Sequence, residues 1–101
     1  MSICKIGQIS AFPDGEVREV YAGGEPFAIC NVDGQLHGVR GVCPHQGGAL
    51  GQGALHGKML VCPWHAWEFD CTTGQHDYNP ELRQTQYAVQ LDGRDILVDF
   101  A

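Results

Sequence analysis

The sequence predicts an all-β fold of small antiparallel sheets, a sandwich-like or barrel-like base, with a loop-rich insertion. Two Asp-Gly dipeptides, at 33–34 and 92–93, each join two β-prone runs, and this dipeptide suits the positive φ angles of tight hairpin turns. Residues 43–80 instead contain many glycines and prolines and show no sustained hydrophobic period, which indicates loops. A chain of 101 residues can bury a single core, so we expect one domain over residues 1–101.

The first predicted strand is EVREVYA, residues 16–22, whose pattern is mixed because Val17 and Tyr21 fall on one face and Val20 falls on the other. The next two predicted strands lie within residues 25–42, on either side of the Asp33-Gly34 turn.

The last predicted hairpin pairs QYAVQL with RDILVDF around Asp92-Gly93. One set of apolar residues alternates along its first strand and another set shares a parity along its second strand, which predicts one buried face. These residues are Tyr87, Val89 and Leu91, then Ile96, Val98 and Phe100.

The charge and the cysteine content limit the classes of function. Six basic and twelve acidic residues give a net charge of -6, which argues against partners such as nucleic acid or an anionic membrane surface. The N-terminal stretch lacks a long apolar run, so we expect no signal peptide and no membrane span. Five cysteines without the spacing of a secreted disulfide scaffold favour a reducing compartment, and we expect a cytoplasmic protein.

Two Cys/His pairs with different spacing stand in the insertion, Cys43-Pro44-His45 and Cys62-Pro63-Trp64-His65. Thiolate and imidazole ligands together suit zinc, copper or iron. The CxxH pair fits a structural zinc site, but the CxH pair is tight for two ligands of one tetrahedral ion. A dinuclear centre removes this difficulty because the members of each pair can bind different metal ions; a structural zinc domain remains the less favoured alternative.

The pattern CPH, then sixteen residues, then CPWH resembles the signature of the Rieske [2Fe-2S] family. The stretch WEFDCTTGQ, the proline at 80 and the closing YAVQLDGRDILVDF are similar to the soluble Rieske ferredoxins of bacterial oxygenase systems. The resemblance implies a Rieske-type fold in which residues 43–80 form the cluster-binding subdomain. It also implies one [2Fe-2S] cluster per chain, with one iron bound by Cys43 and Cys62 and the other by His45 and His65.

The same resemblance implies electron carriage without bond-making chemistry. A monomer would take one electron from a flavin-dependent NAD(P)H reductase and pass it to a terminal oxygenase. The alternative is the Rieske-like small subunit of an assimilatory nitrite reductase. A complete oxygenase is excluded, because 101 residues leave no room for a mononuclear iron module.

Four positions depart from the pattern of the high-potential Rieske proteins of respiratory complexes. Gly48 and Trp64 stand where those proteins have two disulfide-bonded cysteines, and Trp67 and Phe69 stand where they have hydroxyl donors to sulfur. Loss of such donors destabilises the reduced, more negative cluster. We therefore predict a midpoint potential near the lower end of the Rieske range, about -150 mV.

The remaining cysteines and histidines are expected to have no ligand role. Cysteines outside the two pairs should be free thiols, and histidines outside the pairs should lie at the surface. These residues are Cys4, Cys30 and Cys71, then His37, His56 and His76.

Overall fold

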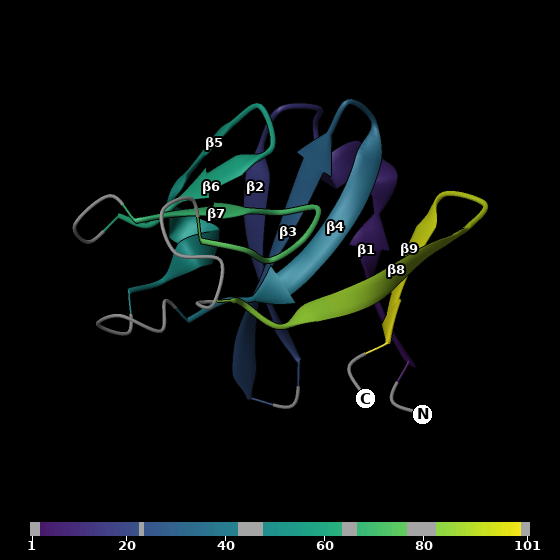
Figure 1. Ribbon diagram of the computed structural model, residues 1–101. Helices are drawn as coiled ribbons and strands as arrows, with labels where there is room; N and C mark the ends of the chain where they lie inside the picture. Colours follow the sequence, from purple (N-terminus) through teal and green to yellow (C-terminus); the bar gives the residue numbers. More distant parts are fainter. Residues whose placement is uncertain (1–2, 23, 43–47, 64–66, 77–82, 100–101) are drawn as a thin grey trace.

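The computed structural model describes residues 3–22, 24–42, 48–63, 67–76 and 83–99. The described residues form two antiparallel sheets (Figure 1). The large sheet has six strands in the order β1-β9-β8-β4-β3-β2, and the small sheet has three in the order β5-β6-β7. The strands of the large sheet are β1 (Ile3–Gln8), β2 (Val17–Ala22), β3 (Glu25–Val32), β4 (Gln35–Arg40), β8 (Gln86–Asp92) and β9 (Asp95–Asp99). Those of the small sheet are β5 (Ala54–His56), β6 (Met59–Val61) and β7 (Glu68–Asp70).

Two short 3₁₀ helices, η1 (Ile9–Ala11) and η2 (Leu50–Gln52), complete the regular structure of the described ranges. Within these ranges, no helix has the length and apolar character needed to cross a bilayer.

The two predicted hairpins and the first predicted strand are confirmed. Asp33 and Gly34 have φ angles of 52° and 85°, so both central residues of the β3–β4 turn have the positive φ of a type I′ turn. The β8–β9 turn places Gly93 at a φ of 63°. Strand β2 pairs with β3 along its whole length, from Val17 opposite Cys30 to Ala22 opposite Glu25.

Regular structure also occurs where the sequence predicted none. Strand β1 adds to the large sheet by antiparallel pairing with β9, and the small sheet lies within the stretch predicted as loops. The prediction of irregular structure was therefore wrong for residues 54–56, 59–61 and 68–70. A strand of three residues contains a single alternation, which is too short to stand out as a period.

Strand β3 is the wall shared by the two parts of the hydrophobic core. Successive side chains of a strand point to opposite faces, so Ala28 and Cys30 pack on one side and Ile29 on the other. On the side of Cys30 the buried partners are Val17, Val39, Leu50, Leu60, Cys62, Phe69 and Cys71. On the side of Ile29 they are Phe12, Ile96 and Val98.

The buried face predicted for the β8–β9 hairpin is confirmed only in part. Ile96 and Val98 are fully buried and Val89 is half-buried, whereas Leu91 is 53% exposed. Strand β8 pairs with β4 only at Gln86 and Tyr87, so its far end, still paired with β9, projects past β4, as Figure 1 shows. Leu91 lies on this projecting end, which explains its exposure; Phe100 lies outside the described residues.

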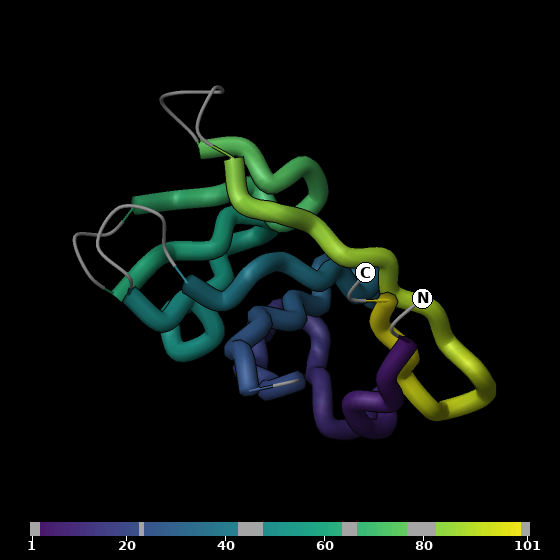
Figure 2. Tube along the Cα trace, turned by 90° about the horizontal axis from the view of Figure 1, so that it is seen from below, coloured from purple at the N-terminus to yellow at the C-terminus, as the bar shows by residue number. Residues whose placement is uncertain are grey.

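The small sheet lies at the end of the molecule far from both termini, and the two views agree on this (Figures 1 and 2). Cys62, the described member of the second Cys/His pair, directly follows β6 of this sheet. Hence the large sheet serves as the base and the small sheet as the support for the candidate site.

Candidate metal centre

The segment that contains Cys43 and His45 is closed at its base by backbone pairing. Val42 and Ala49 form an antiparallel bridge on either side of it. The backbone N–H of Leu50 donates to the Gly41 carbonyl at 2.9 Å, which extends the pairing by one step. The first pair therefore begins directly after an anchored residue.

The second pair begins at Cys62, directly after β6. The backbone N–H of Cys62 donates to the carbonyl of Trp67 at 2.7 Å, and β6 and β7 pair beyond this bond from Val61 opposite Glu68 to Met59 opposite Asp70. We call a pair of bonded backbone segments that closes a loop its neck: the first neck is at Val42 and Ala49, and the second is at Cys62 and Trp67. Cys62 is thus the last residue on one side of the second neck. Its side chain is buried, with 1% of its surface exposed.

The chain on either side of residues 77–82 pairs to form a third neck. Gln75 and Arg83 form an antiparallel bridge, and the backbone N–H of Gln84 donates to the Gly74 carbonyl at 2.7 Å. The side chain of Gln84 then joins this neck to the first one. Its Nε2 donates to the carbonyl of Arg40 at 2.9 Å and also to the carbonyl of Val42, the residue before Cys43.

Of the four predicted ligands, Cys62 lies within the described residues, whereas Cys43, His45 and His65 lie outside them, as do Trp64 and Pro80. Among the described residues, no group of three or more His, Cys, Asp and Glu side chains gathers that could hold a metal ion. The structure thus places one predicted ligand and the ends of the segments that contain the other three.

The surroundings of Cys62 fit an iron–sulfur centre. Its thiol belongs to the apolar cluster that contains Leu60 and Phe69, with Trp67 packed against it. A soft thiolate donor at the base of a loop, backed by an apolar wall, is the arrangement that an iron–sulfur cluster requires.

Three aromatic rings stand beside this position. His76 lies 4.5 Å from Trp67 and 5.3 Å from Phe69 between ring centroids, in edge-to-face geometry with each. The prediction that His76 lies at the surface was wrong, because only 7% of it is exposed. The antiparallel bridge between Phe69 and His76, across the turn that follows β7, brings the ring inward, and the sequence pattern does not reveal this pairing. His56, by contrast, is exposed as predicted, and His37 is half-buried.

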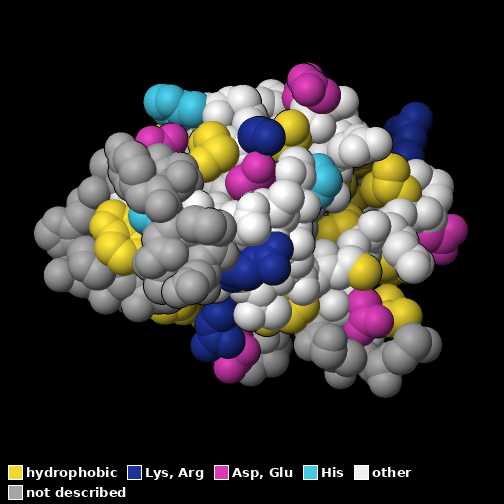
Figure 3. All heavy atoms as spheres, viewed as in Figure 1, with side chains coloured by type: hydrophobic (Ala, Val, Ile, Leu, Met, Phe, Trp, Pro, Cys, Tyr) yellow, Lys and Arg dark blue, Asp and Glu magenta, His cyan; other side chains and the backbone are white. Residues whose placement is uncertain are grey.

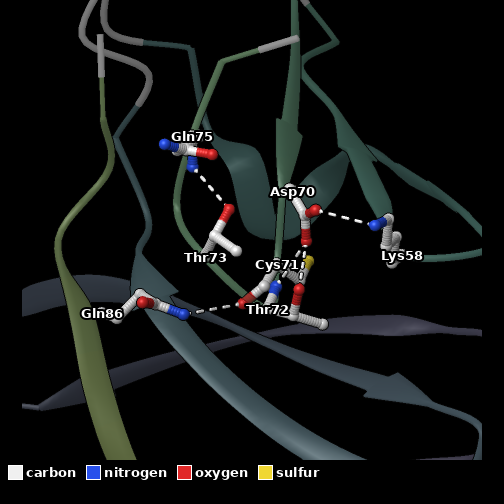
Figure 4. Close-up of polar contacts among 7 residues, drawn as sticks. All are labelled: Lys58, Asp70, Cys71, Thr72, Thr73, Gln75 and Gln86. Atoms are coloured by element: carbon white, nitrogen blue, oxygen red, sulfur yellow. Dashed lines mark hydrogen bonds and ion pairs between the residues drawn. The ribbon is translucent and has the colours of Figure 1, made fainter. Parts of the chain in front are cut away.

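A polar turn fixes the chain where β7 ends (Figure 4). The Asp70 carboxylate accepts hydrogen bonds from the Thr72 backbone N–H at 2.8 Å and the Thr72 hydroxyl at 2.6 Å, and pairs with Lys58 Nζ at 3.2 Å. Partial burial alone would raise the pKa of Asp70. The hydrogen bonds from Thr72 and the charge of Lys58 outweigh it, so the pKa lies below its ordinary value.

Sequence reasoning missed two residues of this region, His76 and Gln84. Both are buried polar residues: Gln84 bonds to the distant Arg40, and His76 packs against the rings of Trp67 and Phe69. His76 was predicted to lie at the surface and no prediction was made for Gln84, because nothing in the neighbours of either residue marks it as buried.

Three anchored necks, a buried cysteine at one of them and the CxH and CxxH pairs of the sequence together define a Rieske-type iron–sulfur protein. The family model for the Rieske [2Fe-2S] domain matches residues 2–94, and the chain belongs to this family. The family carries a [2Fe-2S] cluster, which confirms the predicted cofactor.

Particular relatives narrow the class to ferredoxins. The chain is 31% identical over 103 residues to the "Biphenyl dioxygenase ferredoxin subunit" of Pseudomonas sp. (strain KKS102), covering 100% of this chain and 94% of that one. The structure of the Sphingomonas yanoikuyae B1 ferredoxin is similar with a TM-score of 0.88 and 26% identity, covering 99% of this chain and 100% of that one. A chain in the "Complex of reduced oxygenase and oxidized ferredoxin in carbazole 1,9a-dioxygenase" matches with a TM-score of 0.87 and 26% identity, covering 95% and 91%.

These similarities confirm the predicted fold class and role. The chain has the all-β Rieske fold, and it is an electron carrier of the ferredoxin type rather than a catalytic component.

Proposed function

We propose that this protein carries one electron from a flavin-dependent NAD(P)H reductase to the terminal oxygenase of a dioxygenase system. The observation that carries the proposal is the likeness to ferredoxins over nearly the whole chain, including a ferredoxin solved in a complex with its oxygenase. Two of the relatives described above are named as parts of dioxygenase systems, which favours this function over the nitrite reductase subunit.

The proposed ligand set is Cys43 and Cys62 on one iron and His45 and His65 on the other. The buried Cys62 and the anchored necks at Val42 and Cys62 support it. When bound, the cluster accepts one electron and releases it. The chain itself performs three tasks: it supplies the ligands, holds the loop necks in register, and packs apolar rings behind Cys62.

We further propose that residues 1–101 act as one Rieske domain with its cluster-binding insertion at about 43–80, and that the protein is a cytoplasmic monomer that docks transiently. On the face shown in Figure 3, basic and acidic side chains of the described residues are interspersed rather than gathered by sign. Such a surface, on a chain with a net charge of -6, suits weak and exchangeable protein contacts better than nucleic acid binding.

The ligand set is tested by matched histidine variants. His65→Ala should lose most of the iron and acid-labile sulfide, because one iron loses a ligand, whereas His56→Ala, at an exposed histidine of β5, should keep both. Equal iron content in the two variants would contradict the assignment of His65.

The partners are tested by anaerobic mixing. The reconstituted protein should be reduced by NADH only when a flavoprotein reductase of a dioxygenase system is present, and should be reoxidised by the oxidised terminal oxygenase. The visible spectrum of the cluster follows both steps. Reduction without reoxidation by any such oxygenase, together with electron delivery in a nitrite reductase assay, would overturn the proposed function in favour of the alternative.

A further inference from the structure

Two buried cysteines that electron carriage does not use lie in contact between the two sheets. Cys30 belongs to β3 of the large sheet, and Cys71 follows β7 of the small sheet. Their Sγ atoms are 2.7 Å apart and both side chains are fully buried. A disulfide bond is about 2.04 Å long, so a shift of well under 1 Å would bring the two sulfur atoms to bonding distance.

The backbone of each cysteine is fixed by hydrogen bonds. The Cys71 N–H donates to the Lys58 carbonyl at 2.9 Å, and the Cys71 carbonyl accepts from Gln86 Nε2 at 3.1 Å (Figure 4). Cys30 lies within the β2–β3–β4 ladder, opposite Val17 on one side and His37 on the other. Both sulfur atoms are therefore held in place by ordered backbone, and bond formation would demand little rearrangement.

The reduced cysteine pair should react slowly with oxidants. The hydrogen bond with Cys71, together with burial, raises the pKa of the Cys30 thiol, so Cys30 stays protonated at neutral pH. Neither side chain is exposed, so an oxidant can reach the pair only when the contact between the two sheets opens locally. Oxidation should therefore be slower at this pair than at the exposed Cys4.

We propose that Cys30 and Cys71 are an oxidisable dithiol whose disulfide covalently joins the large sheet to the small sheet. With a diazene such as diamide as oxidant, the two S–H bonds break and one S–S bond forms. The two protons and two electrons pass to the N=N group, which becomes a hydrazine. In a reducing compartment the pair remains a dithiol, and an oxidant of this class converts it.

The direct test treats the reconstituted holoprotein with diamide, alkylates the remaining thiols, and maps the peptides by mass spectrometry without reduction. The expected product is a linked peptide pair containing Cys30 and Cys71, appearing after Cys4 has reacted. A disulfide across a span of 41 residues restricts the unfolded chain, so the midpoint of thermal unfolding should rise by about 5 °C or more. The visible spectrum in the same sample shows whether the cluster survives.

Three variants control this result. Cys71→Ala and Cys30→Ala should lose both the linked peptides and the thermal shift, and Cys4→Ala should keep both. The peptide map of the unsubstituted protein decides the matter even if a core variant fails to fold. Recovery of Cys30 and Cys71 as alkylated thiols after prolonged treatment, or linkage of either one to another cysteine instead, would overturn the proposal.

Discussion

Strands of the large sheet are five to eight residues long, whereas each strand of the small sheet has three. Long strands joined by tight turns supply many ladder hydrogen bonds and bury apolar residues on a face of their own. A sheet of three-residue strands supplies few such bonds. We therefore expect packing against β3 and binding of the [2Fe-2S] cluster to stabilise the small sheet.

The small sheet and strand β9 of the large sheet pack on opposite sides of β3. Leu60, Cys62 and Phe69 of the small-sheet region share one apolar cluster with Ala28 and Cys30 of β3. Ile96 and Val98 pack on the other side of β3 and do not enter this cluster. Changes on the two sides of β3 should thus differ in how strongly they affect the binding of the [2Fe-2S] cluster.

The largest effect is expected for Cys62→Ser. Loss of the buried thiolate should lower the iron and sulfide content at least about tenfold, because the cluster is held by few ligands. Amide exchange should then accelerate in β5–β7 while β8 and β9 stay protected. Cys4→Ser, at an exposed position, is the control and should retain its iron. Equal acceleration of exchange in both sheets would show that they do not differ in dependence on the cluster.

Core truncations on the two sides of β3 should come next. Ile96→Ala and Leu60→Ala each remove a fully buried side chain and should lower the free energy of unfolding by about 3 kcal/mol. Chemical denaturation measures this change. The two variants should differ in cluster loss to a chelator, which Leu60→Ala should accelerate and Ile96→Ala should leave nearly unchanged. The reverse order would mean that the cluster depends on the other side of the core.

A glycine pair sharpens the comparison at the level of the backbone. Gly74 has a φ of 81°, and a Cβ there would meet the Gln84 carbonyl at the base of the third neck. Gly93 has a φ of 63° in the β8–β9 turn, with open space around it. Gly93→Ala should cost about 1 kcal/mol from backbone strain alone, and Gly74→Ala about 2 kcal/mol because a steric clash is added. Thermal unfolding of the two variants measures the difference in stability. Equal losses of stability would contradict the close approach of Gly74 to the Gln84 carbonyl in the third neck.

The smallest effect concerns Asp70. Its pKa is lower in the folded protein, so its charge contributes stability at pH values above the ordinary carboxyl pKa, and this contribution fades as the pH falls through the lowered pKa. Asp70→Asn should cost about 1 kcal/mol at pH 7 and less below about pH 4. Urea unfolding at both pH values measures the change. A cost that grows toward low pH would contradict the sign of the shift.

How far the sequence could predict this structure depends on how local each signal is. Asp33-Gly34 and Asp92-Gly93 specify their turns within a few residues, and the hairpins were predicted correctly. The spacing of Cys43, His45, Cys62 and His65 predicted the family, and the match of the Rieske family model to residues 2–94 confirms it. Here a short pattern was sufficient, and the cofactor followed from it.

Other features depend on pairings that no short sequence pattern specifies, and they were not predictable. The strands of the small sheet are too short to show a period, and the burial of His76 follows from its pairing with Phe69. The contact between Cys30 and Cys71 joins residues far apart in the chain. Both were expected to be free thiols, as they are, but nothing in the sequence places one beside the other.

The potential of the cluster links these observations to function. Trp67, Phe69 and His76 give the region beside Cys62 an aromatic wall. The family resemblance of the sequence implies that Trp67 and Phe69 stand where high-potential Rieske proteins have hydroxyl donors. Phe69→Tyr should therefore raise the midpoint potential, because the added hydroxyl would donate to a sulfur atom of the centre. An unchanged potential in this variant would show that the hydroxyl does not reach it.

A redox titration of the reconstituted protein, followed by the visible spectrum, tests the central claim most directly. A small sheet that supports a Rieske cluster with aromatic rings in place of hydroxyl donors predicts a one-electron midpoint near -150 mV. A midpoint above about +100 mV, well into the upper part of the Rieske range, would contradict the account.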